Sequence, residues 1–87
     1  MPRKVDSNHA EIVAGLRQFG ASVQDLHEVG HGCPDILVGY NEKSYPMEIK
    51  SDCGHLTKDE WSWFEHWKGN AYIVHTIEEA IKIITEG

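Results

Sequence analysis

Two apolar segments joined by a very short connection constrain the fold of this chain most. The first segment covers residues 35–40 and the second covers residues 44–51, with Asn41-Glu42-Lys43 between them. Strands joined this closely form an antiparallel pair, because a parallel pair needs a crossover of about a dozen residues or more. The sequence therefore predicts a β-hairpin whose first strand is covered on both faces.

Charged residues occupy particular places in this hairpin. Asp35 heads the first strand, directly after Gly32-Cys33-Pro34, and Glu48 and Lys50 lie within the second strand. Strand side chains alternate between faces, so Glu48 and Lys50 project from the same face. Two carboxylates on adjacent strands can bind a hard divalent cation, and the backbone carbonyl of Ile49 could supply a third oxygen.

Metal-dependent cleavage of a phosphodiester is the chemistry that this set favours. The metal would lower the pKa of its bound water and polarise the phosphate. Lys50 would orient or help to deprotonate the attacking water, or would stabilise charge on the phosphate. A structural interpretation stays open, because Pro-Asp often starts a turn and alternating Glu and Lys often form a solvated strand face.

The rest of the chain predicts one domain, residues 1–87, of the α/β class, with a mixed sheet flanked by helices in the order α-β-β-β-α-β-α. Pro46 cannot donate to a strand ladder, so we expect it at the strand start or at a bulge. The other predicted elements are a helix over 7–19 with Ser7 as N-cap, a weak strand over 21–28, a helix over 57–68 opened by Thr57, a strand over 71–75, and a last helix that Thr76 and Glu79 open as a capping box.

Three residues before the hairpin are further candidates. Glu11 lies beside the apolar stripe of the first helix and could reach the metal site, or it could be an ordinary solvated glutamate. Gly30 and Gly32 bracket the approach to Asp35, where the absence of side chains could let a DNA backbone come close. The alternative is a turn that requires positive φ at both glycines.

The start of the helix over 57–68 carries another set of candidates. Thr57 and Glu60 are spaced as a capping box, and Thr57 and Lys58 are candidates for nucleic-acid binding, with Lys58 on a phosphate. The helix also has aromatic residues that could stack on bases. Helical spacing favours core packing for Trp61, Phe64 and Trp67, and it leaves Trp63 as a candidate for a dimer contact or a DNA wedge.

The charge balance argues against tight, sequence-independent DNA binding by a single subunit. Eight Lys and Arg stand against fourteen Asp and Glu, a formal net charge of -6, whereas a chain held by general phosphate attraction is basic. A homodimer would pool basic residues such as Arg3, Lys4, Lys43 and Lys58.

Two cysteines do not make a disulfide framework, and no apolar leader or membrane-length apolar run is found, so we expect a cytoplasmic protein without a membrane partner. His31-Gly32-Cys33 and Cys53-Gly54-His55 form a mirrored pair that suggests zinc. Each pair is spaced too tightly for the usual structural zinc site, whose paired ligands have about two to four residues between them.

These residues together resemble the VRR-NUC branch of the PD-(D/E)XK nucleases. The resemblance rests on Glu11 in a first helix, on the segment from Gly30 to Asp35, on Glu48-Ile49-Lys50 and on Leu56-Thr57 before a helix, in that order. It covers nearly the whole chain, from about residue 8 to the last helix.

The resemblance implies a restriction-endonuclease-like core. It implies that Asp35 and Glu48 bind Mg²⁺ or Mn²⁺, that Lys50 is catalytic and that Glu11 assists. The family's stand-alone members, often from phages, resemble Holliday junction resolvases and act as homodimers in DNA recombination and repair. The implied substrate is branched or double-stranded DNA, without a small-molecule cofactor, in a bacterial or phage-infected cell.

One residue departs from the family pattern. The family usually has a glutamine where this chain has Glu60, which leaves the role of Glu60 and the number of metals open. A rival hypothesis from another class is a non-catalytic module that binds DNA or a protein partner, with or without a structural zinc.

Overall fold

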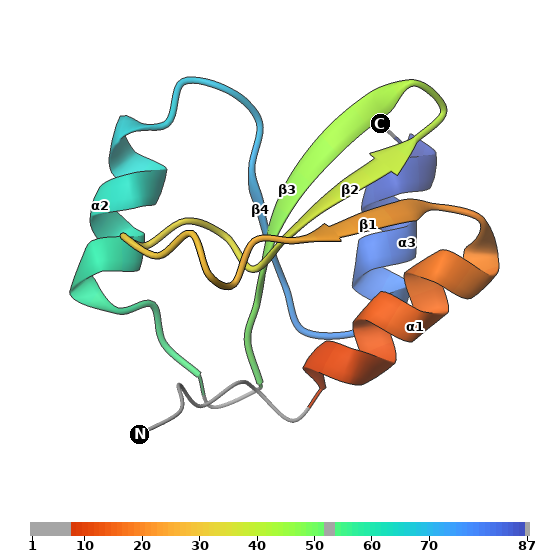
Figure 1. Cartoon of the computed structure of the whole chain (residues 1–87), viewed down its shortest axis with the longest axis horizontal. Coiled ribbons are helices and arrows are strands. Elements are labelled where there is room, and N and C mark those ends of the chain that lie inside the picture. The colour runs from red at the N-terminus through yellow and green to blue at the C-terminus, as the bar shows by residue number, and fades with distance from the viewer. Residues whose placement is uncertain (1–7, 52–53, 87) are drawn as a thin grey trace.

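Seven helices and strands follow one another in the computed structural model, which describes residues 8–51 and 54–86. Their order, α-β-β-β-α-β-α, is the predicted one, and the result is a small α+β domain. The elements are α1 (His9–Phe19), β1 (Ser22–Asp25), β2 (Ile36–Tyr40), β3 (Lys43–Ile49), α2 (Lys58–His66), β4 (Tyr72–Val74) and α3 (Ile77–Glu86) (Figure 1).

The strands form one mixed sheet in the order β1-β2-β3-β4. The β1–β2 and β2–β3 pairs are antiparallel, and β4 runs parallel to β3. The predicted hairpin is confirmed, with Ile36 opposite Met47 and Tyr40 opposite Lys43. Its connection has two residues, not three, because Asn41 and Glu42 both take positive φ, at 52° and 66°. Such turns match the twist of the strands, and β3 therefore starts at Lys43.

One face of the sheet carries the core, against which α1 and α3 pack (Figure 1). Residues at every second position of the central strands point to this face, as the pleat requires. Ile12 and Leu16 of α1 and Ala80 and Ile84 of α3 are buried against them. The strand residues of this core are Ile36, Val38, Tyr45, Met47, Ile49 and Val74.

Helix α2 lies apart from α1 and α3, at the left of Figure 1, and the connection between β1 and β2 reaches across to it. Its buried residue is Glu60, not an aromatic one. The predicted core packing of the aromatic stripe is therefore wrong for Trp61, which is 63% exposed, and for Trp67, which is 47% exposed. Helical spacing shows which residues share a face, but it does not show which face is covered.

Pro46 lies inside β3, opposite Leu37, and not at the strand start or at a bulge as expected. The carbonyl of Ser44, two residues earlier, accepts a hydrogen bond from Asn70 Nδ2 on the β4 side. Pro46 therefore turns its nitrogen to the same side, where pairing with β4 begins only at Met47. A missing N–H is tolerated there because no ladder hydrogen bond needs it.

The helix ends agree in part with the predicted signals. The N-cap of α1 is Asn8 and not residue 7 as expected, which lies outside the described residues, and Gly20 ends this helix with φ at 111°. Thr76 Oγ1 accepts a hydrogen bond from the Glu79 N–H. The Glu79 carboxylate accepts from the His75 N–H and not from the Thr76 N–H, so only half of the second capping box forms. None of the three described helices is long and apolar enough to cross a membrane.

Candidate active site

The alternation along β3 places Glu48 and Lys50 on the face of the sheet that turns away from α1 and α3. Tyr45, Met47 and Ile49 fill the core on the opposite face. Glu48 is nevertheless almost fully buried, with 1% of its surface exposed. A buried glutamate on the outer face of a sheet requires cover and partners, and the neighbouring residues of β2 and α2 supply them.

Asp35 is fixed against β3 by a hydrogen bond between its side chain and the backbone. Its Oδ2 accepts from the Ile49 N–H at 2.9 Å, and its own carbonyl accepts from the Leu26 N–H at 2.8 Å. The N–H and C=O of an extended residue point to the same side of the strand, so the Ile49 carbonyl also faces Asp35. The two carboxylates and the carbonyl that the sequence singled out thus come together at the β2–β3 boundary.

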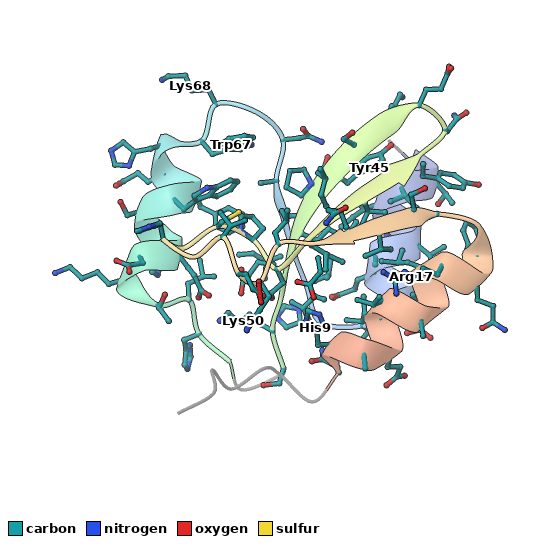
Figure 2. The ribbon with its side chains drawn as sticks, viewed as in Figure 1. His9, Arg17, Tyr45, Lys50, Trp67 and Lys68 are labelled. Atoms are coloured by element: carbon teal, nitrogen blue, oxygen red, sulfur yellow. The ribbon has the colours of Figure 1, made fainter. Side chains whose placement is uncertain are left out.

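Lys50 connects the sheet with α2. Its Nζ lies 2.9 Å from Glu60 Oε1 and 3.4 Å from Glu48 Oε2, and its side chain is 12% exposed. Figure 2 labels Lys50 in the space between the sheet and α2, with carboxylate oxygens beside it. The Lys50 ammonium group thus lies between the side chains of Glu48 and Glu60.

Burial is the largest cause that raises the pKa of Glu48, and the charges of Asp35 and Glu60 raise it further, to about 9. Lys50 opposes this shift but does not cancel it. At neutral pH Glu48 is therefore protonated in the metal-free protein. Its Oε1 is buried and has no hydrogen-bond partner among the described residues, so the site holds an unused oxygen ligand.

Glu60 carries the negative charge that pairs with Lys50. Burial alone would raise the pKa of Glu60, but hydrogen bonds from Lys50 and from the Thr57 backbone lower it. Burial alone would lower the pKa of Lys50, but the hydrogen bond to Glu60 and the charges of Glu48 and Glu60 raise it. The 3.4 Å contact to Glu48 therefore involves a neutral carboxyl group at neutral pH, and the ion pair is Lys50 with Glu60.

The glycine-rich loop has a conformational role at both of its candidate positions. Gly30, His31 and Gly32 all take positive φ, at 74°, 57° and 80°. A Cβ on Gly32 would lie 2.1 Å from the Asp59 carbonyl oxygen of α2, and Gly32 is buried. The proposed approach of a DNA backbone to Gly32 is thus wrong, because the backbone of α2 already occupies that space. A Cβ on Gly30 would meet nothing within 4 Å.

Thr57, the N-cap of α2, and Glu60 form the predicted capping box. Glu60 N–H donates to Thr57 Oγ1 at 3.2 Å, and Thr57 N–H donates to Glu60 Oε1 at 2.8 Å. The oxygen that caps the helix is also the oxygen that binds Lys50. Thr57 and Lys58 are exposed at this helix start, where a phosphate contact stays a prediction.

Glu11 is exposed on α1 and lines a groove that it shares with Gly15, Ile77 and Ile81. Among the described contacts none joins Glu11 to Asp35 or Glu48. Its assignment as a third acidic ligand receives no geometric support, because this groove lies between α1 and α3.

The donor set limits which metal the site suits. Over residues 8–51 and 54–86, no three His, Cys, Asp or Glu side chains are arranged to hold a metal ion. Burial and the charges of Glu48 and Asp35 raise the pKa of the Cys33 thiol, which opposes the thiolate that zinc requires. The second half of the mirrored Cys/His pair includes residue 53, outside the described residues. What remains is an oxygen set of two carboxylates and one carbonyl.

The bond between Glu60 and Lys50 is the main feature that the sequence did not predict. No local pattern in the sequence signals this bond, because Lys50 directly follows β3 and Glu60 lies in α2, with a connecting segment between them. A buried partner for Lys50 could have been suspected from the acid-rich start of α2.

Compared with protein-family models, curated proteins and solved structures, the chain gives no match.

Proposed function

We propose that this chain is a metal-dependent endonuclease that hydrolyses phosphodiester bonds in branched DNA, with Mg²⁺ or Mn²⁺ as its cofactor. The proposal includes a restriction-endonuclease-like core of the VRR-NUC type, a four-way junction as substrate, and a cytoplasmic homodimer. Its chemistry rests on residues of this chain, and its family on the resemblance of those residues in order and spacing.

The observation that carries the proposal is the convergence of Asp35, Glu48 and Lys50 at one end of the β2–β3 hairpin. Asp35 is held by the Ile49 N–H, Lys50 lies within 3.4 Å of Glu48, and Glu48 keeps an unpaired buried oxygen. A purely structural role would leave Glu48 solvated or fully paired. Here burial and the charges of Asp35 and Glu60 disfavour the ionised form of Glu48, and a bound divalent cation would favour that form again.

A cation fits this site because it would neutralise the charges that raise the pKa of Glu48 and would use its orphaned oxygen. Asp35, Glu48 and the Ile49 carbonyl would hold it, and oxygen donors are those that Mg²⁺ and Mn²⁺ prefer. A bound divalent cation supplies activation of water at neutral pH and polarisation of the phosphate.

The chain's own residues would position the substrate and stabilise charge. The raised pKa of Lys50 keeps its ammonium group protonated, so it would stabilise negative charge on the phosphate and orient water, not remove a proton. Glu60 would hold that ammonium group in place through the 2.9 Å contact. Positioning of this kind is worth a large part of a catalysed rate.

A homodimer would supply a second cleavage site and twice the basic residues of a single acidic subunit. Two sites related by a two-fold axis match the two incisions of a junction, and most small oligomers have this symmetry. Among the basic residues it would pool, Lys43 and Lys58 belong to the described part of the chain, and both are exposed. The residue pair 3–4 lies outside that part.

The test is cleavage of an end-labelled four-way junction by purified protein with Mn²⁺, with Mn²⁺ plus chelator, and by Lys50→Met. Cutting by the wild type alone, with circular dichroism showing that the variant is folded, would support the enzyme. Tight junction binding by the wild type without cutting at any metal concentration would contradict it and would favour the non-catalytic module.

A further inference from the structure

A pocket separate from the carboxylate cluster opens between the glycine-rich loop and α2. Its volume is about 370 Å³, which is enough for a planar heterocycle. Two aromatic rings, two imidazoles, one carboxylate and one hydroxyl line it. These residues are His31, Asp59, Ser62, Trp63, His66 and Trp67.

The aromatic wall of this pocket is stacked and anchored. The rings of Trp63 and Trp67 lie with centroids 4.6 Å apart and planes at 18°, and Phe64 packs edge-on against Trp63. Trp67 Nε1 donates to the Asn70 carbonyl at 2.9 Å, and Asn70 Nδ2 donates to the Ser44 carbonyl at 3.0 Å. The last indole of the stack is thus tied to β3, although 47% of its surface is exposed.

The polar wall presents hydrogen-bonding groups of both kinds. His66 Nδ1 lies 2.8 Å from the Ser62 carbonyl. A carbonyl only accepts, so Nδ1 carries the hydrogen and the neutral ring keeps Nε2 as an acceptor. Asp59 supplies a carboxylate on the same rim, and His31 supplies a second imidazole.

The pocket and the candidate active site lie on the two sides of one contact. Gly32 packs against the Asp59 backbone so closely that a Cβ would lie 2.1 Å from its carbonyl oxygen. His31 and Asp59 face the pocket, whereas the next residue in α2, Glu60, binds Lys50 in the active site. The pocket lining therefore begins at the residue of α2 that precedes the partner of Lys50, and Trp63 follows that partner by three positions.

We propose that this pocket binds an unpaired nucleobase of the DNA substrate, stacked on Trp67, whose other face lies against Trp63. A carboxylate at the rim repels a phosphate but accepts hydrogen bonds from base N–H groups. Stacking on exposed indoles is how proteins hold single-stranded bases. The inference rests on the proposed nuclease function and adds its substrate class: DNA with an unpaired nucleotide beside the cleaved phosphate.

The binding test uses a short oligo-dT strand that contains one 2-aminopurine, in chelator so that no cleavage occurs. We expect its fluorescence to be quenched by wild-type protein and the affinity to fall by about tenfold in Trp67→Ala, in line with the energy of one stacked base. Trp67→Phe keeps an aromatic ring at this position, so we expect it to retain most of the wild-type affinity. The matched control is Trp61→Ala, because Trp61 is 63% exposed on α2 but does not line the pocket. Equal affinities of the two alanine variants would overturn the inference.

The cleavage test compares a branched substrate having an unpaired nucleotide at the branch with a continuous duplex, in Mn²⁺. Trp67→Ala lowers the rate on the branched substrate only, and Trp61→Ala changes neither. Cleavage by the wild type with no effect of Trp67→Ala would contradict base binding in the pocket but would support the nuclease function. Quenching that depends on Trp67, without any cleavage, would support base binding in the pocket but would contradict the nuclease function. Loss of a dimer on gel filtration in Trp67→Ala, with quenching unchanged, would make the stack a subunit contact and overturn the inference.

Discussion

Glu60 Oε1 accepts a hydrogen bond from Lys50 Nζ at 2.9 Å, and the same oxygen accepts from the Thr57 N–H at 2.8 Å. One carboxylate therefore caps α2 and holds the lysine of the sheet. Glu60 is 3% exposed, and its two contacts tie the start of α2 to Lys50, the residue that follows β3. Both the stability of the domain and the chemistry of the proposed site depend on it.

Exchange of Glu60 for glutamine tests whether its charge or its shape matters. Glu60→Gln keeps an amide oxygen for the cap and for Lys50 and removes one negative charge beside Glu48. We expect cleavage within about tenfold of the wild-type rate, or faster. Glu60→Ala, in contrast, loses the cap and the nearer partner of Lys50, at about 2 kcal/mol or more of stability. Rates on a labelled junction and denaturant unfolding of both variants check this. A glutamine variant as slow as the alanine variant would show that the charge itself is needed.

Removal of the lysine leaves the Glu60 carboxylate buried without its partner. We expect Lys50→Met to abolish cleavage and to cost about 3 kcal/mol of stability above neutral pH, the usual range for half of a buried ion pair. Lys50 depresses the pKa of Glu60, so its stabilising effect is present above the ordinary carboxyl pKa and is lost as the pH falls through the depressed value. Urea unfolding of both proteins over a pH series measures it. A deficit that stays constant into the acid range would argue against this ion pair.

The stability of the metal-free protein falls with pH because of Glu48. A raised carboxyl pKa gives stability that is complete below about 4.5, the ordinary value, and is lost as the pH rises toward about 9. The slope for one proton is at most about 1.4 kcal/mol per pH unit. Glu48→Gln removes this dependence and raises the melting temperature at mildly alkaline pH, while it abolishes cleavage. Thermal unfolding of the wild type and the variant across this pH range checks this. Equal slopes of melting temperature against pH for the two proteins would contradict the role of Glu48.

Divalent cations are expected to stabilise the wild type at mildly alkaline pH and to leave Glu48→Gln unchanged, since ligand binding to the folded state raises its stability by mass action. Asp35→Asn keeps one oxygen for the Ile49 N–H, so it retains the fold and loses most of the Mn²⁺ effect. Melting curves with and without Mn²⁺ compare the three proteins. Equal shifts in all three would place the cation elsewhere.

The glycine-rich loop offers a matched pair of substitutions. Gly32→Ala places a methyl group 2.1 Å from the Asp59 carbonyl oxygen at a φ of 80°, so α2 must move away and carry Glu60 with it. Gly30→Ala has open space and only the left-handed φ to tolerate, a cost of about 1–2 kcal/mol. We expect Gly32→Ala to be clearly less stable and less active than Gly30→Ala. Denaturant midpoints and junction cleavage rates give the comparison, and similar values for the two would contradict the packing described.

Much of the fold could be predicted because its signals are local. Alternation placed Glu48 and Lys50 on one face, and the short connection specified an antiparallel hairpin. Strand ends were less predictable, since burial and pairing, not composition, decide where a ladder stops. Pro46 shows the same limit, because its tolerance depends on where β4 begins to pair.

The site was predictable only for the residues of the hairpin itself. Asp35, Glu48 and Lys50 could be related through strand geometry, but the contact of Gly32 with α2 and the pairing of Lys50 with Glu60 depend on where α2 packs against the sheet. Helical periodicity could not tell that α2 buries its glutamate and exposes Trp61 and Trp67. The position of Glu11 likewise depends on how α1 rotates against the sheet, which the sequence pattern does not define.

Paramagnetic NMR of ¹⁵N-labelled protein during a titration with substoichiometric Mn²⁺ tests the central claim most directly. Mn²⁺ broadens the amide signals nearest to it, so the binding site is located without reference to activity. We predict that Asp35 and the stretch from Glu48 to Lys50 broaden first, that Glu11 stays sharp, and that Glu48→Gln abolishes the effect. Broadening that begins at another cluster of the chain, or that survives unchanged in Glu48→Gln, would contradict the account.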